Sequence, residues 1–375
     1  MRAGFSTDGT RVITAAMLDS SATMIWDVTL SGDADWANFP VQKDWPGNVE
    51  FSPDGLHLVA TGKTDSVSIW ELATGRKVRS IPARGAAPEG SDFQRFDLSA
   101  DGKLIATAGN DGTTRVWDVS TGKQRFAVVH PGGATSAYEL GGGMRPSAAW
   151  SADGRYLVTS SPEGTTKIVD DTGSDVRVLR ETGDFIFTDA DISADDRLVV
   201  TVAWPPVLII GDRIKVFERD SGKLMTTIKA EAHEVKFDPS GARVATANER
   251  GVAQIWDVET GESLTKLLGH AGPIMDIAFS PDASTVATAG LDGTIRLWDP
   301  DSGEQRLLLR AHRAGVFAVD FSPDGKKLAT AGSGDGARVW ALDLDDLLEI
   351  ARDQVTRTLT DDECHQYLHL DDCPT

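Results

Sequence analysis

Short runs of alternating apolar and polar residues fill most of this chain, and residues that favour turns separate them. The clearest example begins at Gly269 and contains four apolar runs with Gly, Pro or Asp at each break. The runs cover residues 274–279, 285–289, 295–298 and 307–309. A two-residue period with such breaks is typical of short strands joined by hairpins. This stretch therefore predicts one four-stranded antiparallel unit.

The same unit recurs along the chain. Its first turn, of the Ser-Pro-Asp-Gly type, appears eight times, directly after Phe5, Phe51, Leu98, Trp150, Ile192, Phe237, Phe279 and Phe321. Its third strand also appears eight times, anchored at Trp26, Trp70, Trp117, Val169, Phe217, Trp256, Trp298 and Trp340. Successive anchors lie 39 to 52 residues apart. Four strands repeated at a period of about 40–45 residues are typical of sheets arranged radially around an axis.

These residues resemble the WD-repeat family, with Gly269-His270 and Trp298-Asp299 as its paired landmarks. The resemblance covers residues 1 to about 341 and implies an all-β fold, a single β-propeller of eight blades with the first strand of each blade innermost. The alternative is seven full blades plus a partial one. Because only four residues precede Phe5 and the eighth unit stops after Trp340, we expect a last blade of three strands that no N-terminal strand completes.

The period changes after residue 341, so residues 342–375 form a separate segment. One helical face is marked by Leu344, Leu347, Leu348, Ala351 and Val355. The stretch from Thr360 to Glu363 has the pattern of a capping box, which predicts a second short helix. We expect this short helical tail to pack on the propeller beside the last blade. The pattern Leu-Thr-x-x-Glu-Cys from residue 359, followed by Tyr-Leu and Cys-Pro, resembles the segment that closes the WD-repeat region of large bacterial multidomain regulators. This resemblance implies a role as a sensor or scaffold.

The charge of the chain limits its partners. The formal net charge of −20 argues against nucleic acid, because binding to phosphates needs a basic surface. The longest aliphatic run, residues 207–210, is too short to span a bilayer, and we see no secretory segment before the first turn. We therefore expect a cytoplasmic monomer without a cofactor. Its partner would be another protein or another domain of a larger regulator, because the family it resembles provides a scaffold and not a chemistry.

Four residues of the clearest unit look like a hydrolase triad with a fourth member: His270, Thr288, Asp292 and Trp298. In the family that the chain resembles, these residue types form a hydrogen-bonded tetrad inside a blade. The Asp holds the imidazole, the imidazole bonds the hydroxyl, and the hydroxyl bonds the indole N–H, so that buried polar groups are paired. We interpret the set as structural, and we do not expect an enzyme. Other units keep only part of the tetrad, so units one, four and five should be the least stable.

The innermost strands should line a central channel. The residue before the leading apolar position of each first turn is a carboxylate in four units: Glu50, Asp97, Asp191 and Asp320. Such a ring could hold Ca²⁺ through oxygen ligands, and an enzyme or a Ca²⁺-binding propeller is the alternative function. The interpretation that we favour is channel lining or contacts between blades, because ionisable residues tolerate burial when they are paired or hydrated. No metal site is therefore assigned.

All long insertions should open on one face of the propeller, where the turns between strands two and three and the loops between blades lie. They are residues 84–91, 131–144 and 204–210. Exposed apolar clusters often mark an interaction site, and binding residues tend to lie on loops held by a rigid frame. The candidate partner-binding residues are Trp204, Pro205, Pro206, Val207, Leu208, Ile209 and Ile210, with Tyr138 and Met144 from the glycine-rich loop. Alternatively, residues 207–210 fold back over a weak fifth unit.

Overall fold

The computed structural model describes residues 48–61, 66–82, 93–109, 111–130, 146–161, 165–180, 186–204, 214–333 and 336–342. Of residues 1–47 it describes the backbone of four short strands: β1 (Arg2–Phe5), β2 (Val12–Ala15), β3 (Thr23–Ile25) and β4 (Asn38–Phe39). The described residues form strands and turns only, and none of them belongs to a helix that could cross a membrane. The helices expected within residues 342–375 lie outside the described residues, of which Leu342 is the last.

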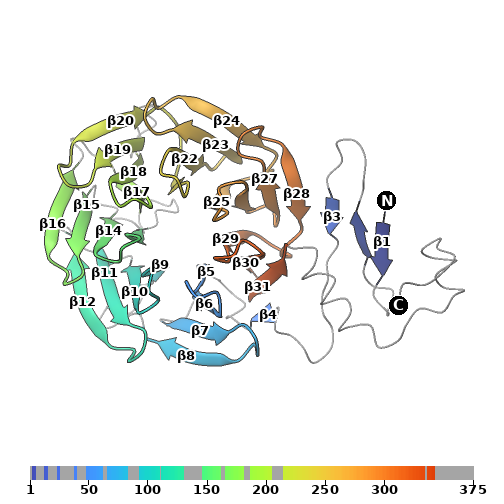
Figure 1. The fold of residues 1–375 in the computed structure, drawn as a ribbon, viewed down its shortest axis with the longest axis horizontal. Coiled ribbons are helices and arrows are strands. Elements are labelled where there is room, and N and C mark those ends of the chain that lie inside the picture. The colour runs from blue at the N-terminus through green and yellow to red at the C-terminus, as the bar shows by residue number, and fades with distance from the viewer. Residues whose placement is uncertain are drawn as a thin grey trace, which may run out of the picture.

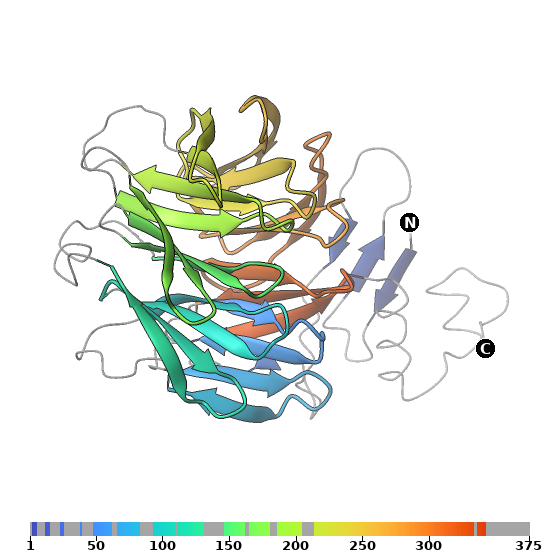
Figure 2. The same ribbon diagram turned by 60° about the vertical axis from the view of Figure 1, so that its left-hand side comes forward.

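Seven antiparallel four-stranded sheets surround a central axis and form a β-propeller (Figure 1). Repeats two to eight of the sequence supply these seven blades in order, except for the fourth strand of blade seven, which comes from the first repeat. The first strand of each blade lies nearest the axis. Figure 2 shows the same blades turned, with each sheet facing the next.

The strands of the first four blades have the following bounds. Blade one comprises β5 (Val49–Phe51), β6 (His57–Thr61), β7 (Val67–Glu71) and β8 (Lys77–Ile81). Blade two comprises β9 (Phe93–Leu98), β10 (Leu104–Gly109), β11 (Thr113–Asp118) and β12 (Gln124–Val129). Blade three comprises β13 (Ala148–Trp150), β14 (Tyr156–Ser161), β15 (Thr165–Asp170) and β16 (Asp175–Arg180). Blade four comprises β17 (Ile186–Ile192), β18 (Leu198–Trp204), β19 (Ile214–Glu218) and β20 (Leu224–Ile228).

The last three blades complete the ring. Blade five comprises β21 (Glu234–Phe237), β22 (Arg243–Ala247), β23 (Val252–Asp257) and β24 (Ser263–Leu268). Blade six comprises β25 (Ile274–Phe279), β26 (Val286–Gly290), β27 (Ile295–Trp298) and β28 (Gln305–Leu309). Blade seven comprises β29 (Val316–Phe321), β30 (Lys327–Gly332), β31 (Gly336–Ala341) and, as its fourth strand, β4.

The ring has seven blades and not eight, so the first count made from the sequence is wrong and its alternative is confirmed. The first sequence repeat supplies β1, β2 and β3, which form a three-stranded meander outside the ring (Figure 1). In this meander β3 pairs in parallel with β28 of blade six, Thr23 lying opposite Leu307 and Met24 opposite Leu308. The meander stays a partial blade because the strand that follows it, β4, belongs to blade seven.

Blade seven is complete, which corrects the expectation of a three-stranded last blade. The strand β4 pairs with β31, with Phe39 opposite Ala337 and Asn38 opposite Arg338. This strand comes from residues 38–39 and not from the first four residues of the chain. An open strand edge presents unpaired N–H and C=O groups, and β4 covers part of the edge of β31.

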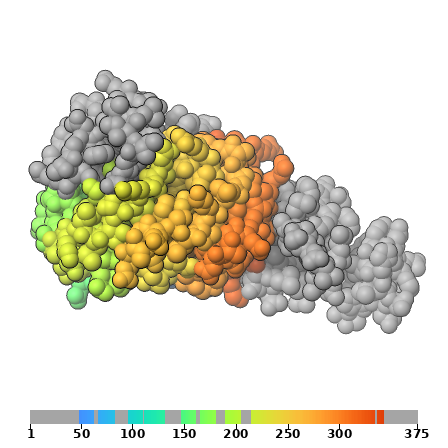
Figure 3. All heavy atoms as spheres, turned by 90° about the horizontal axis from the view of Figure 1, so that it is seen from above, coloured from blue at the N-terminus to red at the C-terminus, as the bar shows by residue number. Residues whose placement is uncertain are grey.

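The apolar core lies between neighbouring blades. Second strands such as β10 and β26 are buried along their whole length, because a blade covers them on either side. Trp298 of blade six is only 1% exposed and packs with Ile255 and Leu267 of blade five. Fourth strands such as β12 expose most of their residues at the rim, where the space-filling view shows blades in close contact (Figure 3). Second strands are therefore continuous apolar runs, whereas fourth strands carry polar and charged residues.

The turns between strands three and four need glycine for two reasons. Gly222 has a φ of 69°, a left-handed conformation that other residues rarely adopt. A Cβ at this position would also lie 2.7 Å from Cδ of Arg177, in the fourth strand of the preceding blade. The turn thus packs tightly on its neighbour. Gly261 and Gly303 likewise lie against the preceding blade, whereas Gly122 has open space around it and reflects turn geometry alone.

Candidate functional site

The seven first strands line a channel along the propeller axis, with a cavity of about 360 Å³. The residues that carry charge in it belong to alternate positions of these strands, which point to one side of a strand. The acidic ones on the strands are Glu50, Asp97, Asp189, Asp191, Asp276 and Asp320, and the basic ones are Arg95 and Lys236. Asp238, directly after β21, also lines the cavity.

The four carboxylates that the sequence singled out bind the backbone of the next blade. Each accepts a hydrogen bond from an N–H of the neighbouring first strand. The pairs are Glu50 with Leu98 (3.2 Å), Asp97 with Trp150 (2.6 Å), Asp191 with Phe237 (2.8 Å) and Asp320 with Phe51 (2.8 Å). The inner edge of a first strand has no strand beside it, so these carboxylates satisfy donors that would otherwise need water. Among the described residues, no group of three or more His, Cys, Asp or Glu is arranged to hold a metal ion.

The three remaining joints between blades carry other polar bonds. They are the Ala190 N–H to Ser147 Oγ (2.9 Å), His233 Nε2 to the Ile274 carbonyl (2.7 Å) and the Val319 N–H to Asp276 Oδ2 (2.9 Å). Sequence reasoning missed all three. Ser147 and Asp276 lie two positions before the residue that precedes the leading apolar position of each first turn. The two-residue period of a strand places them on the same channel side, so the sequence could have revealed them. Each of the seven joints is thus bridged by a polar bond beside the channel.

Burial changes the protonation of the channel acids. It raises the pKa of Asp97 to about 6 and that of Asp320 to about 7, although the N–H of the next blade favours the ionised form in both cases. The pKa of Glu50 lies well above its ordinary value because of burial and of its neighbours Asp97 and Asp320. Lys236 Nζ lies 3.5 Å from Asp191 Oδ1, and that carboxylate raises the pKa of the ammonium. The Lys236 ammonium therefore stays charged while Asp97 and Asp320 titrate at about pH 6 and pH 7.

Arg95 crosses the channel from blade two. Its Nη1 lies 3.0 Å from Asp189 Oδ1 of blade four, and its Nη2 pairs with Glu234 of blade five. Burial acts to lower the pKa of Arg95, but Glu234 and Asp189 outweigh burial and raise it, so the guanidinium stays charged. Blade three lies between blade two and blade four, and at the position that corresponds to Arg95 it has Ser147. The small side chain of this serine leaves room for Arg95 to reach across. Sequence reasoning missed this bridge, because it depends on how blades face one another across the axis.

The four residues that resemble a hydrolase triad meet inside blade six. His270 Nδ1 lies 3.0 Å from Asp292 Oδ2, and its Nε2 lies 2.8 Å from Thr288 Oγ1. The indole N–H of Trp298 donates to the same hydroxyl oxygen at 2.8 Å. Burial lowers the pKa of His270, so the neutral ring donates from Nδ1 and accepts at Nε2. Thr288 is fully buried, and its hydroxyl is out of reach of any substrate.

Other blades keep parts of this arrangement. In blade seven, His312 Nε2 lies 2.8 Å from Thr330 Oγ1, to which the Trp340 indole also donates. Blade three has Val169 and no tryptophan at the third-strand anchor, yet the buried His130 lies 3.1 Å from Thr159 Oγ1, a bond that sequence reasoning missed because it looked for the tryptophan first. The remaining polar pairs of this type are Trp117 with Thr107 (3.0 Å) and Trp256 with Thr246 (2.9 Å).

Blade four has lost the arrangement. Phe217 occupies the tryptophan position, opposite Val199 in the strand register, and offers no donor. The hydroxyl of Thr201, two residues further along, is buried and has no hydrogen-bond partner among the described residues. A buried hydroxyl without a partner is unfavourable. This blade therefore contains a specific weak point.

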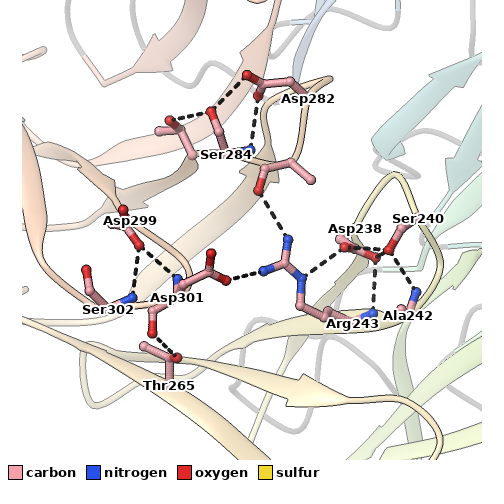
Figure 4. A network of polar contacts seen from close by, with 12 residues as sticks. Asp238, Ser240, Ala242, Arg243, Thr265, Asp282, Ser284, Asp299, Asp301 and Ser302 are labelled. Atoms are coloured by element: carbon pink, nitrogen blue, oxygen red, sulfur yellow. Dashed lines mark hydrogen bonds and ion pairs between the residues drawn. The ribbon is translucent and has the colours of Figure 1, made fainter.

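The face that carries the first turns is built of short turns tied to one another, as the joint between blades five and six shows (Figure 4). Arg243 donates from Nε to Asp238 of its own turn at 3.0 Å. It also donates from Nη1 to Asp301 (2.7 Å) and from Nη2 to the Ala283 carbonyl (3.2 Å), both in turns of blade six. Asp301 is exposed, so this ion pair contributes little by itself, but together the bonds fix the two turns in place.

The long insertions follow strand ends on the other face. Second and fourth strands of an antiparallel meander run in the same direction, so β8, β12 and β18 all end on one side of the ring. The insertions 84–91, 131–144 and 204–210 begin near these ends. Of Trp204 the structure describes only the backbone, at the end of β18. The other predicted partner-binding residues, Tyr138, Met144, Pro205, Pro206, Val207, Leu208, Ile209 and Ile210, lie outside the described residues.

Three segments of the chain match the family model described as WD domain, G-beta repeat: residues 91–118, 261–299 and 303–341. No curated protein matches the chain. The segments 261–299 and 303–341 each contain the fourth strand of one blade and the first three strands of the next. The segment that matches the family model is thus shifted by one strand relative to the blade. For this reason the last matched segment ends at the third strand of blade seven. Propellers of WD40 repeats generally bind other proteins and are typically non-catalytic scaffolds.

Proposed function

We propose that this chain is a non-catalytic platform that binds another protein or another domain of a larger regulator. In this proposal it is the sensor or scaffold portion of a bacterial regulatory system and works in the cytoplasm as a monomer. The observation that carries the proposal is the use of its polar side chains. The tetrad around His270 is buried inside a blade, and carboxylates of the channel bind backbone amides of neighbouring blades. These groups are engaged in holding a rigid frame together, and such frames are suited to position binding loops.

The face on which β8, β12 and β18 end is the surface that suits this function best. The insertions that follow these strands belong to blades one to four, which are consecutive around the ring. Residues 204–210 are apolar in sequence, and an apolar cluster held at a surface favours association with a partner. The opposite face offers tight turns bonded to one another, as at Arg243. We therefore assign partner contact to Trp204 and residues 207–210, with Tyr138 and Met144 beside them.

The charge of the chain supports a protein partner. A net charge of −20 repels the phosphates of nucleic acids and of anionic lipid surfaces. The proposal therefore includes neither nucleic acid nor membrane among the ligands.

Quantitative capture from a bacterial lysate with the intact chain as bait tests the proposal. The double variant Trp204→Ala, Leu208→Asp replaces apolar side chains of the insertion. The matched control is Leu264→Asp, because Leu264 is 51% exposed on β24 at the rim of blade five. We expect at least one signalling or transcription protein that wild type and control enrich and that the double variant loses. The melting temperatures of all three proteins should agree.

Two outcomes would contradict the proposal. One is the absence of any enriched protein, and the other is equal enrichment by all three baits. If the double variant unfolds, residues 207–210 belong to the core of blade four. The contact surface would then be withdrawn.

A further inference from the structure

The ring is closed by non-covalent contacts at one place. From β4 the chain runs through β5 and the following blades to β31, so the polypeptide itself links each of these blades to the next. The strands β29 to β31 must then meet β4 and blade one without such a connection. Within the described part of the chain, the contacts that hold the propeller shut are therefore those between these elements.

The strand pairing at this closure is short. The register of β31 with β4 covers two residue pairs, Ala337 with Phe39 and Arg338 with Asn38. In the other six blades, the register of the third strand with the fourth covers four or five residue pairs. The pairing between β31 and β4 therefore stabilises blade seven less than the pairing of third and fourth strands stabilises each of the other blades.

The apolar packing at the closure is also thin. The core cluster shared by blades seven and one has ten buried residues, and five of them are alanines: Ala60, Ala318, Ala329, Ala331 and Ala337. The cluster shared by blades four and five contains a single alanine among eleven buried residues. Apolar stabilisation grows with the area removed from water, so small side chains hold this joint more weakly.

One polar bond of the closure runs from the Phe51 N–H to Asp320 Oδ2. Four charged or titratable groups on other strands surround the Asp320 carboxyl: Asp276 of β25, Asp97 of β9, Glu50 of β5 and Lys236 of β21. Three of these are acids. The ammonium of Lys236 is already paired with Asp191, and Arg95 is paired with Asp189 and Glu234. Ionisation of Asp320 therefore adds a like charge to a group of acids at a joint that has short strand pairing and small apolar side chains.

We propose that Asp320 is a pH-sensitive latch, which holds blade seven against blade one while its carboxyl is protonated and loosens this joint when the carboxyl ionises. A protonated carboxyl still accepts the Phe51 N–H through its carbonyl oxygen, so the closed joint keeps its bond. Burial raises the pKa of Asp320 from 3.8 to about 7, which places the change at physiological pH. The closed ring binds the proton more tightly than an opened joint, so raising the pH through 7 favours opening. The inference does not depend on the partner proposed above.

Hydrogen–deuterium exchange of the intact chain at pH 6 and pH 8, corrected for the intrinsic effect of pH, tests the latch. If opening returns Asp320 to its ordinary pKa, the protection of amides in β5 and β29 should fall by about tenfold between pH 6 and pH 8. Amides of blade five should keep the same protection at both values. In D320N, which keeps an acceptor but cannot ionise, the fall should disappear.

The matched control is S147A, which removes a side chain that accepts the Ala190 N–H but does not titrate. It should lower protection in β17 equally at pH 6 and pH 8, and it should leave the tenfold change at the closure in place. Equal protection of the closure at both pH values, or a fall in D320N as large as in wild type, overturns the proposal. If D320N does not fold, the wild-type comparison between the closure and blade five decides alone.

Discussion

Asp320 Oδ2 accepts a 2.8 Å hydrogen bond from the backbone N–H of Phe51, although 269 positions separate the two residues in the chain. The same kind of bond joins Glu50 to Leu98 across 48 positions. One local feature, a carboxylate before the leading apolar residue of a first turn, therefore serves both consecutive blades and the closure of the ring. The bond between Asp320 and Phe51 matters more for holding its two blades together, because the strand pairing there is short and the apolar side chains are small.

Replacement of Asp320 by alanine should destabilise the propeller. The Phe51 N–H would lose its acceptor at a joint where Phe51 is 6% exposed, and an orphaned buried donor costs about 1–3 kcal/mol. At pH 6 we expect D320A to unfold at lower urea concentration than wild type, with D320N between them. Identical urea midpoints for D320A and wild type would show that the bond is not needed.

Removal of the Thr288 hydroxyl should break the tetrad of blade six. In Thr288→Val the Trp298 indole N–H and His270 Nε2 lose their common partner, so we expect a loss of about 1–3 kcal/mol. Thr201→Val is the matched control, because this buried hydroxyl has no partner to lose among the described residues. It should leave stability unchanged or raise it. The prediction fails if the two valine variants are destabilised to the same extent in thermal unfolding.

Ala283→Gly should stabilise blade six. Ala283 adopts a φ of 58°, and the left-handed conformation costs an L-residue about 1–2 kcal/mol, of which the greater flexibility of unfolded glycine cancels part. The reverse change, Gly325→Ala, tests the same turn one blade further on, where φ is 71° and a Cβ would meet Pro281 at an ordinary 3.6 Å. We expect a higher melting temperature for A283G and a lower one for G325A. Shifts of the same sign would refute this explanation.

The melting temperature should be highest near pH 4 and should fall as the pH rises from about 4 to 7. Asp97 and Asp320 have pKa values raised to about 6 and about 7, so the folded state holds protons that the unfolded state releases, and stability falls as pH rises through these values. Asp292 behaves in the opposite way: burial raises its pKa, but bonds from Thr294 and Ala271 outweigh burial and lower it to about 2. Its contribution is lost as pH falls from about 4 to 2.

Differential scanning calorimetry from pH 3 to pH 9 checks this profile. D320N should flatten part of the decline between about pH 4 and pH 7 and leave the acid limb in place. A melting temperature that rises steadily from pH 4 to pH 8 would contradict the raised pKa values of the channel acids.

The sequence by itself determined the elements of this protein and the repeat that they form. Strands and hairpins could be predicted because their signals are local: a two-residue apolar period, and Gly, Pro or Asp at each turn. The residues of the tetrad could be named for a similar reason, since His270, Thr288, Asp292 and Trp298 all lie within one repeat. The alternation that predicted strands also placed Glu50, Asp97, Asp191 and Asp320 on the channel side, although it could not say which groups they bind.

Only the tertiary structure decided the number of blades and the way in which the ring closes. Both depend on whether residues 38–39 pair within their own repeat or with β31, some 300 positions away. The local sequence pattern of these two residues is the same for either pairing, so it cannot decide between them. The bridge from Arg95 to Asp189 and Glu234 has the same origin, because it joins three blades that face one another only once the ring exists. Contacts between distant repeats form only when the blades are packed into a ring. Their energies depend on how far apart the packed blades hold the two partners, and the sequence of one repeat does not contain that distance.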